Sequence, residues 1–234
     1  MKIEKIASYT SVEIGSIPFL LGQYDPMNMA GFDTILSDYA DKPMMRLQHA
    51  AYEAFLKMAA AAENDGHTLC ILSATRSFDY QKTIWENKWT GNYPIDGGIN
   101  ACETYPDGYT RAIKIMEYSA MPGTSRHHWG TDIDLNALDN AAFEKEFKPL
   151  YQWLKKNANR FGFFQPYSTK GPQRPYGYNE EKWHWTYLPL SQHYTRYIAD
   201  HLIDNQVSGF MGDEYCDQID IVDHYILGID PSCK

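Results

Sequence analysis

The sequence predicts an α+β fold in which a small antiparallel sheet is flanked by helices within a single domain. Segments with a helical spacing of apolar residues, above all 44–63 and 141–160, are mixed with short stretches of alternating apolar and polar residues. Their order does not follow the strand–helix–strand rhythm that builds a parallel sheet. With 234 residues, 44% of them hydrophobic and 15% aromatic, the chain can bury a substantial core.

The N-terminal half supplies the first elements of this fold. Residues 1–40 have no clear periodicity and are expected to be irregular. A helix over 44–63 ends at an Asp-Gly pair, because glycine tolerates the left-handed conformation found at helix C-termini. A buried strand over 68–76 and a helix over 78–89 follow. Residues 90–108, rich in Gly, Pro, Asn and Asp, are expected to form a long loop that faces a substrate.

The C-terminal half is also expected to contain a mixture of helices and short strands. In chain order we expect a helix over 109–118, a strand over 130–135, a helix over 141–160, a strand over 161–164, a Tyr-, Gly- and Pro-rich loop over 166–178, a strand over 182–187, a helix over 190–204, and a small helix and loop over 215–234. No repeat, low-complexity tract or linker divides the chain, so residues 1–234 are expected to form one domain.

Charge and composition exclude several classes of partner. The net charge is −9, and no run of Lys or Arg is present that could follow a phosphate backbone, so a nucleic-acid partner is excluded. No segment reaches the roughly 18 apolar residues of a transmembrane helix. The N-terminus lacks the ordered regions of a signal peptide. The protein is therefore either cytoplasmic or exported, with its signal absent from this sequence.

The four cysteines do not form a metal-binding pattern. None of Cys70, Cys102, Cys216 and Cys233 belongs to a C-x-x-C pair, which argues against a cysteine zinc site or a thioredoxin-like motif. Cys70 lies in an apolar run and is expected in the core. Cys216 and Cys233 are close enough in sequence for a disulfide in an oxidising compartment.

A candidate metal site combines a loop histidine with residues of two strands. His127 and Asp134 are separated by Gly130, and a turn at that glycine would bring both side chains to one point. His184 lies in the alternating segment 182–187, on the opposite face from its two tryptophan neighbours. A neighbouring strand that carries Asp134 would bring these two side chains together. Two histidines and one carboxylate leave a fourth position open, which is typical of catalytic zinc sites.

Two neighbouring residues are alternative ligands, and one acid is a candidate base. His128 is adjacent to His127, and Asp132 shares a strand face with Asp134, so spacing alone does not choose between them. Glu181 comes three residues before His184, where it is expected in the loop that enters the strand. Metal-assisted hydrolysis needs such a base to accept a proton from water.

Three motifs in order resemble the zinc D-alanyl-D-alanine carboxypeptidases and D,D-dipeptidases of bacterial cell-wall metabolism, the group that includes the vancomycin-resistance enzymes. The family patterns S-x-x-R-S-x-x-x-Q, S-x-H-x-x-G-x-A-x-D and E-x-W-H are matched by Ser73, Arg76, Ser77 and Gln81, then by Ser125, His127, Gly130 and Asp134, and then by Glu181, Trp183 and His184. The resemblance covers about residues 45–190 and leaves 1–40 and 205–234 as appended segments. Asp132 departs from it, because the family has a small residue there.

The resemblance implies a D,D-peptidase-like (hedgehog-type) fold with one zinc ion, and it assigns a role to each matching residue. His127, Asp134 and His184 would bind the metal, Glu181 would be the base, Arg76 would stabilise the oxyanion, and Ser125 and Gln81 would hold the substrate. The substrate would be a peptidoglycan stem peptide in the periplasm or cell envelope, cleaved at or near D-alanine. The alternatives are an L,D-carboxypeptidase, a peptidoglycan endopeptidase and a non-catalytic zinc-binding domain. Asp132 would add charge beside the metal or accept a hydrogen bond from a ligand histidine.

Overall fold

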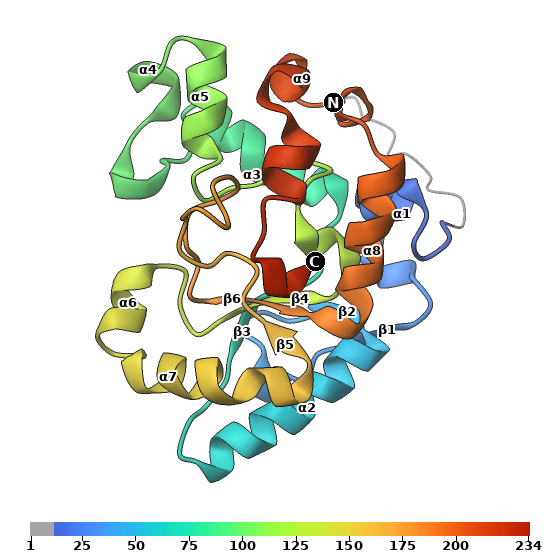
Figure 1. Cartoon of the computed structure of the whole chain (residues 1–234), viewed down its shortest axis with the longest axis vertical. Helices are drawn as coiled ribbons and strands as arrows, with labels where there is room; N and C mark the ends of the chain where they lie inside the picture. The colour runs from blue at the N-terminus through green and yellow to red at the C-terminus, as the bar shows by residue number, and fades with distance from the viewer. Residues whose placement is uncertain (1–11) are drawn as a thin grey trace.

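A small sheet lies between two groups of helices in the computed structural model, which describes residues 12–234 (Figure 1). The first eleven residues of the predicted irregular segment lie outside the described residues. The strands are β1 (Phe32–Thr34), β2 (Arg46–Gln48), β3 (Ile71–Ser73), β4 (Asp132–Leu135), β5 (Phe163–Phe164) and β6 (His184–Tyr187). The α-helices are α1 (Ile17–Leu20), α2 (His49–Asn64), α3 (Phe78–Trp89), α4 (Ala101–Thr104), α5 (Gly108–Ile115), α6 (Asn140–Glu144), α7 (Lys148–Asn157), α8 (Leu188–His201) and α9 (Cys216–Ile219).

The larger sheet is antiparallel throughout, with the strand order β3-β4-β6-β5, which confirms the predicted α+β class. Its two central strands pair so that Asp134 lies directly opposite His184. Because side chains alternate along a strand, Ile133 and Leu135 face one side of the sheet and Asp132 and Asp134 the other. The sheet therefore has one apolar face and one polar face, and both are buried.

The apolar face of the sheet packs against α2 and α7, which lie below it in Figure 1. Phe55 and Met58 of α2, Leu154 of α7 and Ile133 of β4 are all completely buried in this core. Trp185 of β6 joins them, as expected for the face opposite His184. Burial of a side chain of this size contributes about 1.5–3 kcal/mol, so this core fixes the position of the strands that carry the polar face.

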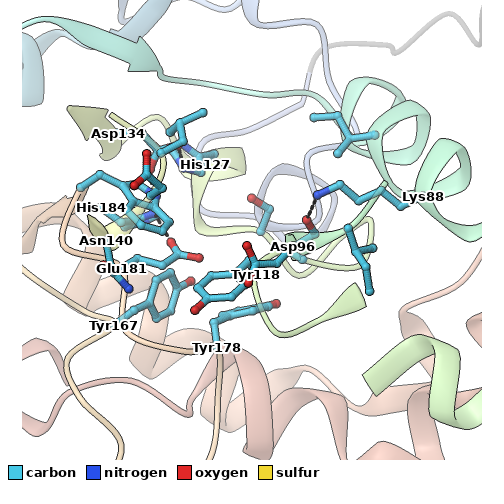
Figure 2. A pocket seen from close by; sticks show the side chains of 18 of the residues that line it. Lys88, Asp96, Tyr118, His127, Asp134, Asn140, Tyr167, Tyr178, Glu181 and His184 are labelled. Atoms are coloured by element: carbon cyan, nitrogen blue, oxygen red, sulfur yellow. Dashed lines mark hydrogen bonds and ion pairs between the residues drawn. The ribbon is translucent and has the colours of Figure 1, made fainter. Parts of the chain in front are cut away.

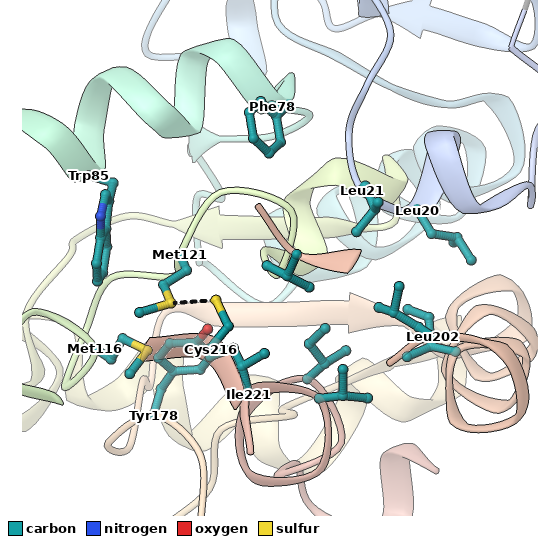
Figure 3. Packing of buried hydrophobic residues seen from close by; sticks show 14 of the residues in the cluster. Leu20, Leu21, Phe78, Trp85, Met116, Met121, Tyr178, Leu202, Cys216 and Ile221 are labelled. Carbon is teal, nitrogen blue, oxygen red and sulfur yellow. Dashed lines mark hydrogen bonds between the residues drawn. The ribbon is translucent and has the colours of Figure 1, made fainter. Parts of the chain in front are cut away.

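A second core joins α1, α3, α5 and α8 to the C-terminal segment (Figure 3). Trp85 of α3 is completely buried there, and the Sγ atom of Cys216 lies 3.7 Å from the Sδ atom of Met121. All four cysteines are free, so the structure has no disulfide between Cys216 and Cys233. Within residues 12–234, no helix is both long enough and apolar enough to span a membrane.

Helix 78–89 has the predicted bounds, but the predicted helix over 141–160 is wrong as a single element. It is divided into α6 and α7, with a break at Lys145–Phe147. Pro149 explains the break, because proline lacks the backbone N–H that a continuing helix needs and is favoured in the first turn of a new one. Residues 90–108 also contain more structure than the predicted loop, namely α4 and a 3-10 turn over Asp96–Gly98.

The sequence interpretation missed the small sheet formed by β1 and β2. The pairing of Phe32 with Gln48 places a strand in the segment expected to be irregular, and it delays the start of α2 to His49. Each of these strands has three residues, which is too short for an alternating pattern to be visible.

The turn expected at Gly130 is present, and it leads from a 3-10 helix over Arg126–Trp129 into β4. Gly130 has φ +67°, and a Cβ atom there would lie 2.3 Å from Cε1 of Phe32. We expect Gly130→Ala to lower the free energy of unfolding by about 2–4 kcal/mol, because backbone strain and overpacking act together. Gly66→Ala is the matched control, since Gly66 has φ +83° but no atom within 4 Å of an added Cβ.

Urea denaturation of both variants measures this difference. Gly66→Ala reports backbone strain alone and should lose only about 1 kcal/mol. Equal losses for the two variants would show that the close approach of Phe32 is not what requires glycine at position 130.

Candidate metal centre and substrate cavity

Three buried side chains converge at the polar face of the larger sheet. The register of β4 and β6 brings Asp134 and His184 together, and the 3-10 helix before Gly130 brings His127 to the same point. One donor atom from each of these residues lies within 4.8 Å of the other two. Figure 2 shows the three side chains grouped at one end of a cavity.

The hydrogen bonds around the two histidines fix which nitrogen of each ring faces the other ligands. Nδ1 of His127 donates a hydrogen bond to the carbonyl oxygen of Ala74 (2.9 Å), so the lone pair of the neutral ring is on Nε2. This Nε2 lies 3.2 Å from Oδ2 of Asp134. Nε2 of His184 donates to Oδ2 of Asp132 (2.9 Å), so in the neutral ring Nδ1 carries the lone pair, 3.1 Å from Oδ1 of Asp134.

When both rings are neutral the converging atoms are all acceptors, and they then repel one another unless a cation lies between them. Nε2 of His127 and Oδ1 of Asp134 are also buried without a hydrogen-bond partner. Unpartnered buried acceptors are rare in folded proteins, and a bound cation is a common reason for them. Two histidine nitrogens and one aspartate oxygen are the donor set of a catalytic zinc site.

The electrostatics of the site are those of a buried cluster rich in carboxylates. Burial and the neighbouring Arg76 lower the pKa of His127 to about 4, so His127 is neutral at pH 7. Burial also acts to lower the pKa of His184, but the hydrogen bonds that its ring donates to surrounding carboxylates outweigh burial and raise the pKa well above its usual value. A cation bound at Nδ1 would therefore displace a proton from this ring. Burial raises the pKa of Glu181, whose Oε2 lies 3.4 Å from Nδ1 of His184. An acid with a raised pKa beside a metal site is suited to proton transfer.

The structure separates His128 from the candidate ligands. Nδ1 of His128 donates to the carbonyl oxygen of Arg76 (2.8 Å), and Nε2 accepts from the backbone N–H of Gly123 (3.1 Å). Both ring nitrogens are used, and the ring is completely buried. His128 therefore supports the loop that carries His127 and has no free lone pair for a metal.

Asp132 lies on the far side of the His184 ring, away from the cluster, and belongs to a second buried network. Its Oδ2 accepts from Nε of Arg126 (3.0 Å), and its Oδ1 accepts from the hydroxyls of Thr131 and Thr186 (2.7 Å each). The side chains of Arg126 and Asp132 are completely inaccessible to solvent. Asp132 thus accepts a hydrogen bond from His184 and orients its ring. This is the second predicted role of Asp132, acceptance of a hydrogen bond from a ligand histidine.

Removal of Asp132 should weaken the metal centre and the fold together. We expect Asp132→Ala to lower the affinity for zinc about 10- to 100-fold, because His184 loses the acceptor that fixes its tautomer. The same change leaves Arg126 as an unpaired buried cation and should lower the free energy of unfolding by about 3–5 kcal/mol. Competition with a fluorescent chelator measures the affinity, and thermal unfolding of the metal-free protein measures the stability.

Asp132→Asn is the matched variant, because it keeps an acceptor oxygen for His184 and removes only the charge. Its zinc affinity should fall less than that of Asp132→Ala. Unchanged affinity in Asp132→Ala would show that the hydrogen bond from His184 to Asp132 does not support metal binding.

Arg76 follows β3 and extends toward the candidate ligands. One terminal nitrogen lies 3.6 Å from Oδ2 of Asp134, and the other donates to Oε1 of Gln81 (2.9 Å). Gln81 in turn donates from Nε2 to the carbonyl oxygen of Ala120 (2.8 Å), and it is only 1% exposed. The implied direct contact of Gln81 with the substrate is therefore wrong for this structure. Gln81 lies behind Arg76 and orients it.

A cavity of about 690 Å³ opens in front of the cluster. Arg76, Ser125 and Glu181 line it together with the candidate ligands, whereas Gln81 does not. Trp183 also lines the cavity and lies outside β6, so the expectation that it packs with Trp185 on the apolar face is wrong.

Both long segments noted in the sequence contribute to the cavity wall. Pro94 and Ile95 come from segment 90–108, and Tyr167 and Tyr178 from segment 166–178. The tyrosine-rich composition of the second segment was a signal for such a wall. Lys88 of α3 and Tyr118 also line the cavity, but no sequence pattern distinguished them from surface residues.

The C-terminal segment holds the tyrosine wall in place. The backbone N–H of Asp230 donates to the carbonyl oxygen of Pro166 (2.8 Å), and its carboxylate accepts from Oγ of Ser168 (2.6 Å). Arg174 donates to the carbonyl oxygens of Tyr178 (2.9 Å) and Gly228 (3.3 Å). The segment 205–234 therefore packs on the cavity wall, although it lies outside the family resemblance.

Comparison with known proteins identifies one family. The sequence profile of VanY, described as D-alanyl-D-alanine carboxypeptidase, matches residues 44–190. A D-alanyl-D-alanine carboxypeptidase of Enterococcus faecalis is 30% identical over 133 residues, which are 56% of this chain and 44% of the relative. The putative carboxypeptidase YodJ of Bacillus subtilis is 27% identical over 173 residues, 72% of this chain and 56% of the relative. The chain thus spans about half the length of these relatives.

Similarity to a solved structure supports the fold. The LdcB LD-carboxypeptidase aligns with a TM-score of 0.54 and 22% identity, over 83% of this chain and 79% of that one.

Proposed function

Because the chain belongs to the VanY family of D-alanyl-D-alanine carboxypeptidases, we propose that it is a zinc-dependent carboxypeptidase that removes D-alanine from peptidoglycan stem peptides. The observation that carries this proposal is the convergence of His127, Asp134 and His184 within 4.8 Å at the end of a cavity. Glu181 and Arg76 line the same cavity, so the metal, the base and the electrophilic group would meet one substrate.

His127 would hold the ion through Nε2 and Asp134 through its carboxylate, since Nε2 of His127 and Oδ1 of Asp134 lack hydrogen-bond partners, and His184 would hold it through Nδ1, the nitrogen that faces Asp134. When bound, zinc supplies Lewis acidity, which polarises a carbonyl group and lowers the pKa of a coordinated water to about 7. Asp132 and the carbonyl oxygen of Ala74 would keep both rings in the tautomer that presents these atoms.

The residues of the chain itself would move the proton and stabilise the developing charge. Glu181 accepts a proton from the attacking water as the new C–O bond forms, and it delivers that proton to the leaving amine as the C–N bond breaks. Arg76 donates hydrogen bonds to the carbonyl oxygen as it becomes negative. Gln81 keeps the guanidinium directed at this position through its 2.9 Å hydrogen bond. Ser125, which also lines the cavity, would contact the substrate backbone.

The proposed function has consequences for the extent of the domain and for the cellular compartment of the protein. Residues 1–234 would form a single zinc peptidase domain, because the C-terminal segment packs on the cavity wall rather than apart from it. A peptidoglycan substrate would place the protein in the periplasm or cell envelope. A non-catalytic zinc-binding domain is disfavoured, since both Glu181 and Arg76 line the cavity.

Incubation with defined stem peptides and mass analysis of the products tests the activity. The zinc-loaded protein should remove one residue from a pentapeptide that ends in D-Ala-D-Ala and should leave the matching peptide that ends in L-Ala-L-Ala intact. Removal of D-alanine from the tetrapeptide but not from the pentapeptide would show an L,D-carboxypeptidase instead. No cleavage by fully loaded protein would contradict the proposal.

A further inference from the structure

One lysine enters the cavity from the wall opposite the candidate ligands. Lys88 lies in the last turn of α3, and Figure 2 shows its side chain extending into the cavity across from His184 and Glu181. Its Nζ donates a hydrogen bond to the hydroxyl of Ser119, which is itself buried. The proposed reaction does not use this ammonium group.

Lys88 forms no ion pair within 4.0 Å among residues 12–234, although the carboxylates of Asp96 and Glu181 lie near enough to act on its charge. Lys182 shows the contrast, because its Nζ lies 2.7 Å from Oε1 of Glu144, whereas Lys88 forms no such ion pair within 4.0 Å. An ammonium group has three N–H donors, and Ser119 accepts only one of them. Burial lowers the pKa of Lys88, and the nearby Arg76 cation lowers it further. A partly buried cation with spare donors is a binding position for an anion.

The surroundings of Lys88 suit a small terminal residue. Ile84, one helical turn earlier on α3, lines the same wall together with Pro94 and Ile95. These apolar side chains exclude water and lower the local dielectric constant, which strengthens an ion pair. A methyl side chain with a carboxylate beside it matches this combination of apolar wall and ammonium group, although the carboxylate of Asp96 also lines the cavity.

The two cations of the cavity would then have different tasks. Arg76 is directed to the metal end, since it lies 3.6 Å from Asp134 and is held there by Gln81. Lys88 lies farther from the candidate ligands, on the opposite wall (Figure 2). The terminal carboxylate of a carboxypeptidase substrate lies one residue beyond the scissile carbonyl, about 3.6 Å farther along the chain. A carbonyl at Arg76 therefore leaves the peptide end inside the cavity that Lys88 also lines.

We propose that Lys88 binds the C-terminal carboxylate of the peptide and thereby makes the enzyme select free chain ends over internal peptide bonds. This inference rests on the proposed carboxypeptidase function, and it assigns Lys88 as the specificity-determining residue for an exopeptidase. Ser119 orients the ammonium group through its hydroxyl.

Two peptides that differ only at the end test this assignment. The first is a stem pentapeptide with a free C-terminal carboxylate, and the second is the same peptide with a C-terminal amide. The parent protein should cleave the acid about 10- to 100-fold more efficiently than the amide, which is the worth of a hydrogen bond to a charged group. In Lys88→Met the rate for the acid should fall by this factor and the rate for the amide should stay the same. Lys88→Arg should recover part of the preference.

The control is Lys57→Met, which removes the same charge from an exposed position on α2 and should keep the parental preference. Equal cleavage of acid and amide by the parent would overturn the proposal without any variant, and so would an unchanged preference in folded Lys88→Met. If Lys88 instead bound another carboxylate of the stem peptide, Lys88→Met would also keep the preference for the acid, because the acid and the amide both contain that other carboxylate.

A binding measurement separates this proposal from the proposed function. Titration calorimetry of the acid and the amide with zinc-loaded Glu181→Gln measures recognition without turnover. Tighter binding of the acid that disappears when Lys88→Met is added to this variant supports the role of Lys88, even if the parent cleaves neither peptide. Equal binding of the two peptides overturns it, whatever the parent cleaves.

Discussion

Glu181→Gln is expected to lower kcat/KM for a D-Ala-D-Ala peptide about 100- to 10,000-fold, the usual contribution of general acid–base catalysis. Glutamine has nearly the same shape as glutamate but cannot accept and return a proton. Glu181 is buried at the cavity and 3.4 Å from His184, yet it is not one of the three converging ligands. The variant should therefore keep one zinc ion per chain. Steady-state kinetics and metal analysis of the same preparation measure both properties.

Glu180→Gln is the control, because Glu180 is the adjacent acid and bonds to Thr169 rather than lining the cavity. This variant should cleave the peptide at the parental rate. A Glu181→Gln protein with full activity would show that another group acts as the base.

His127→Ala should abolish stoichiometric zinc binding and reduce activity at least about 1,000-fold, since the metal contributes several kcal/mol to stabilisation of the transition state. The neighbouring His128 offers a closely matched comparison, because both rings are buried and adjacent in sequence. His128→Ala removes hydrogen bonds to Arg76 and Gly123 and should destabilise the fold, but it should retain one zinc ion. Metal analysis of both purified variants measures the zinc content per chain and shows which of the two histidines is the ligand.

Two results would contradict this assignment. Stoichiometric zinc in His127→Ala would exclude Nε2 of His127 as a ligand. Loss of zinc in a folded His128→Ala protein would mean that the hydrogen bonds of His128 position the metal site more strongly than the geometry suggests.

The sequence allowed the core of the site to be predicted because strand alternation is local information. The pattern around His184 and Asp134 indicated which side chains share a face, and the observed register pairs these two residues directly. Helix 78–89 was predictable for the same reason, since Ser77 caps its first turn by accepting from the N–H of Tyr80. Spacing alone did not choose between His128 and His127, and only the family resemblance favoured His127, because the choice depends on hydrogen bonds to residues more than 40 positions away.

Features that depend on distant contacts were not predictable. The hydrogen bond from His184 to Asp132 was one of the two predicted roles of Asp132, but the buried ion pair of Asp132 with Arg126 was not expected from the sequence. Gln81 matched a family pattern, yet its orientation toward Arg76 follows from the packing of α3. Lys88 has no sequence signal, because only the folded chain shows that this end of α3 borders a cavity.

Titration of zinc into metal-free protein, with release of D-alanine from a stem pentapeptide as the signal, tests the central claim most directly. Our account predicts no release without metal, a linear rise in rate as zinc is added, and a plateau at one equivalent per chain. The converging donor atoms of His127, Asp134 and His184 provide one such position. Release that does not depend on zinc, or no release from protein shown to hold one zinc ion, would contradict it.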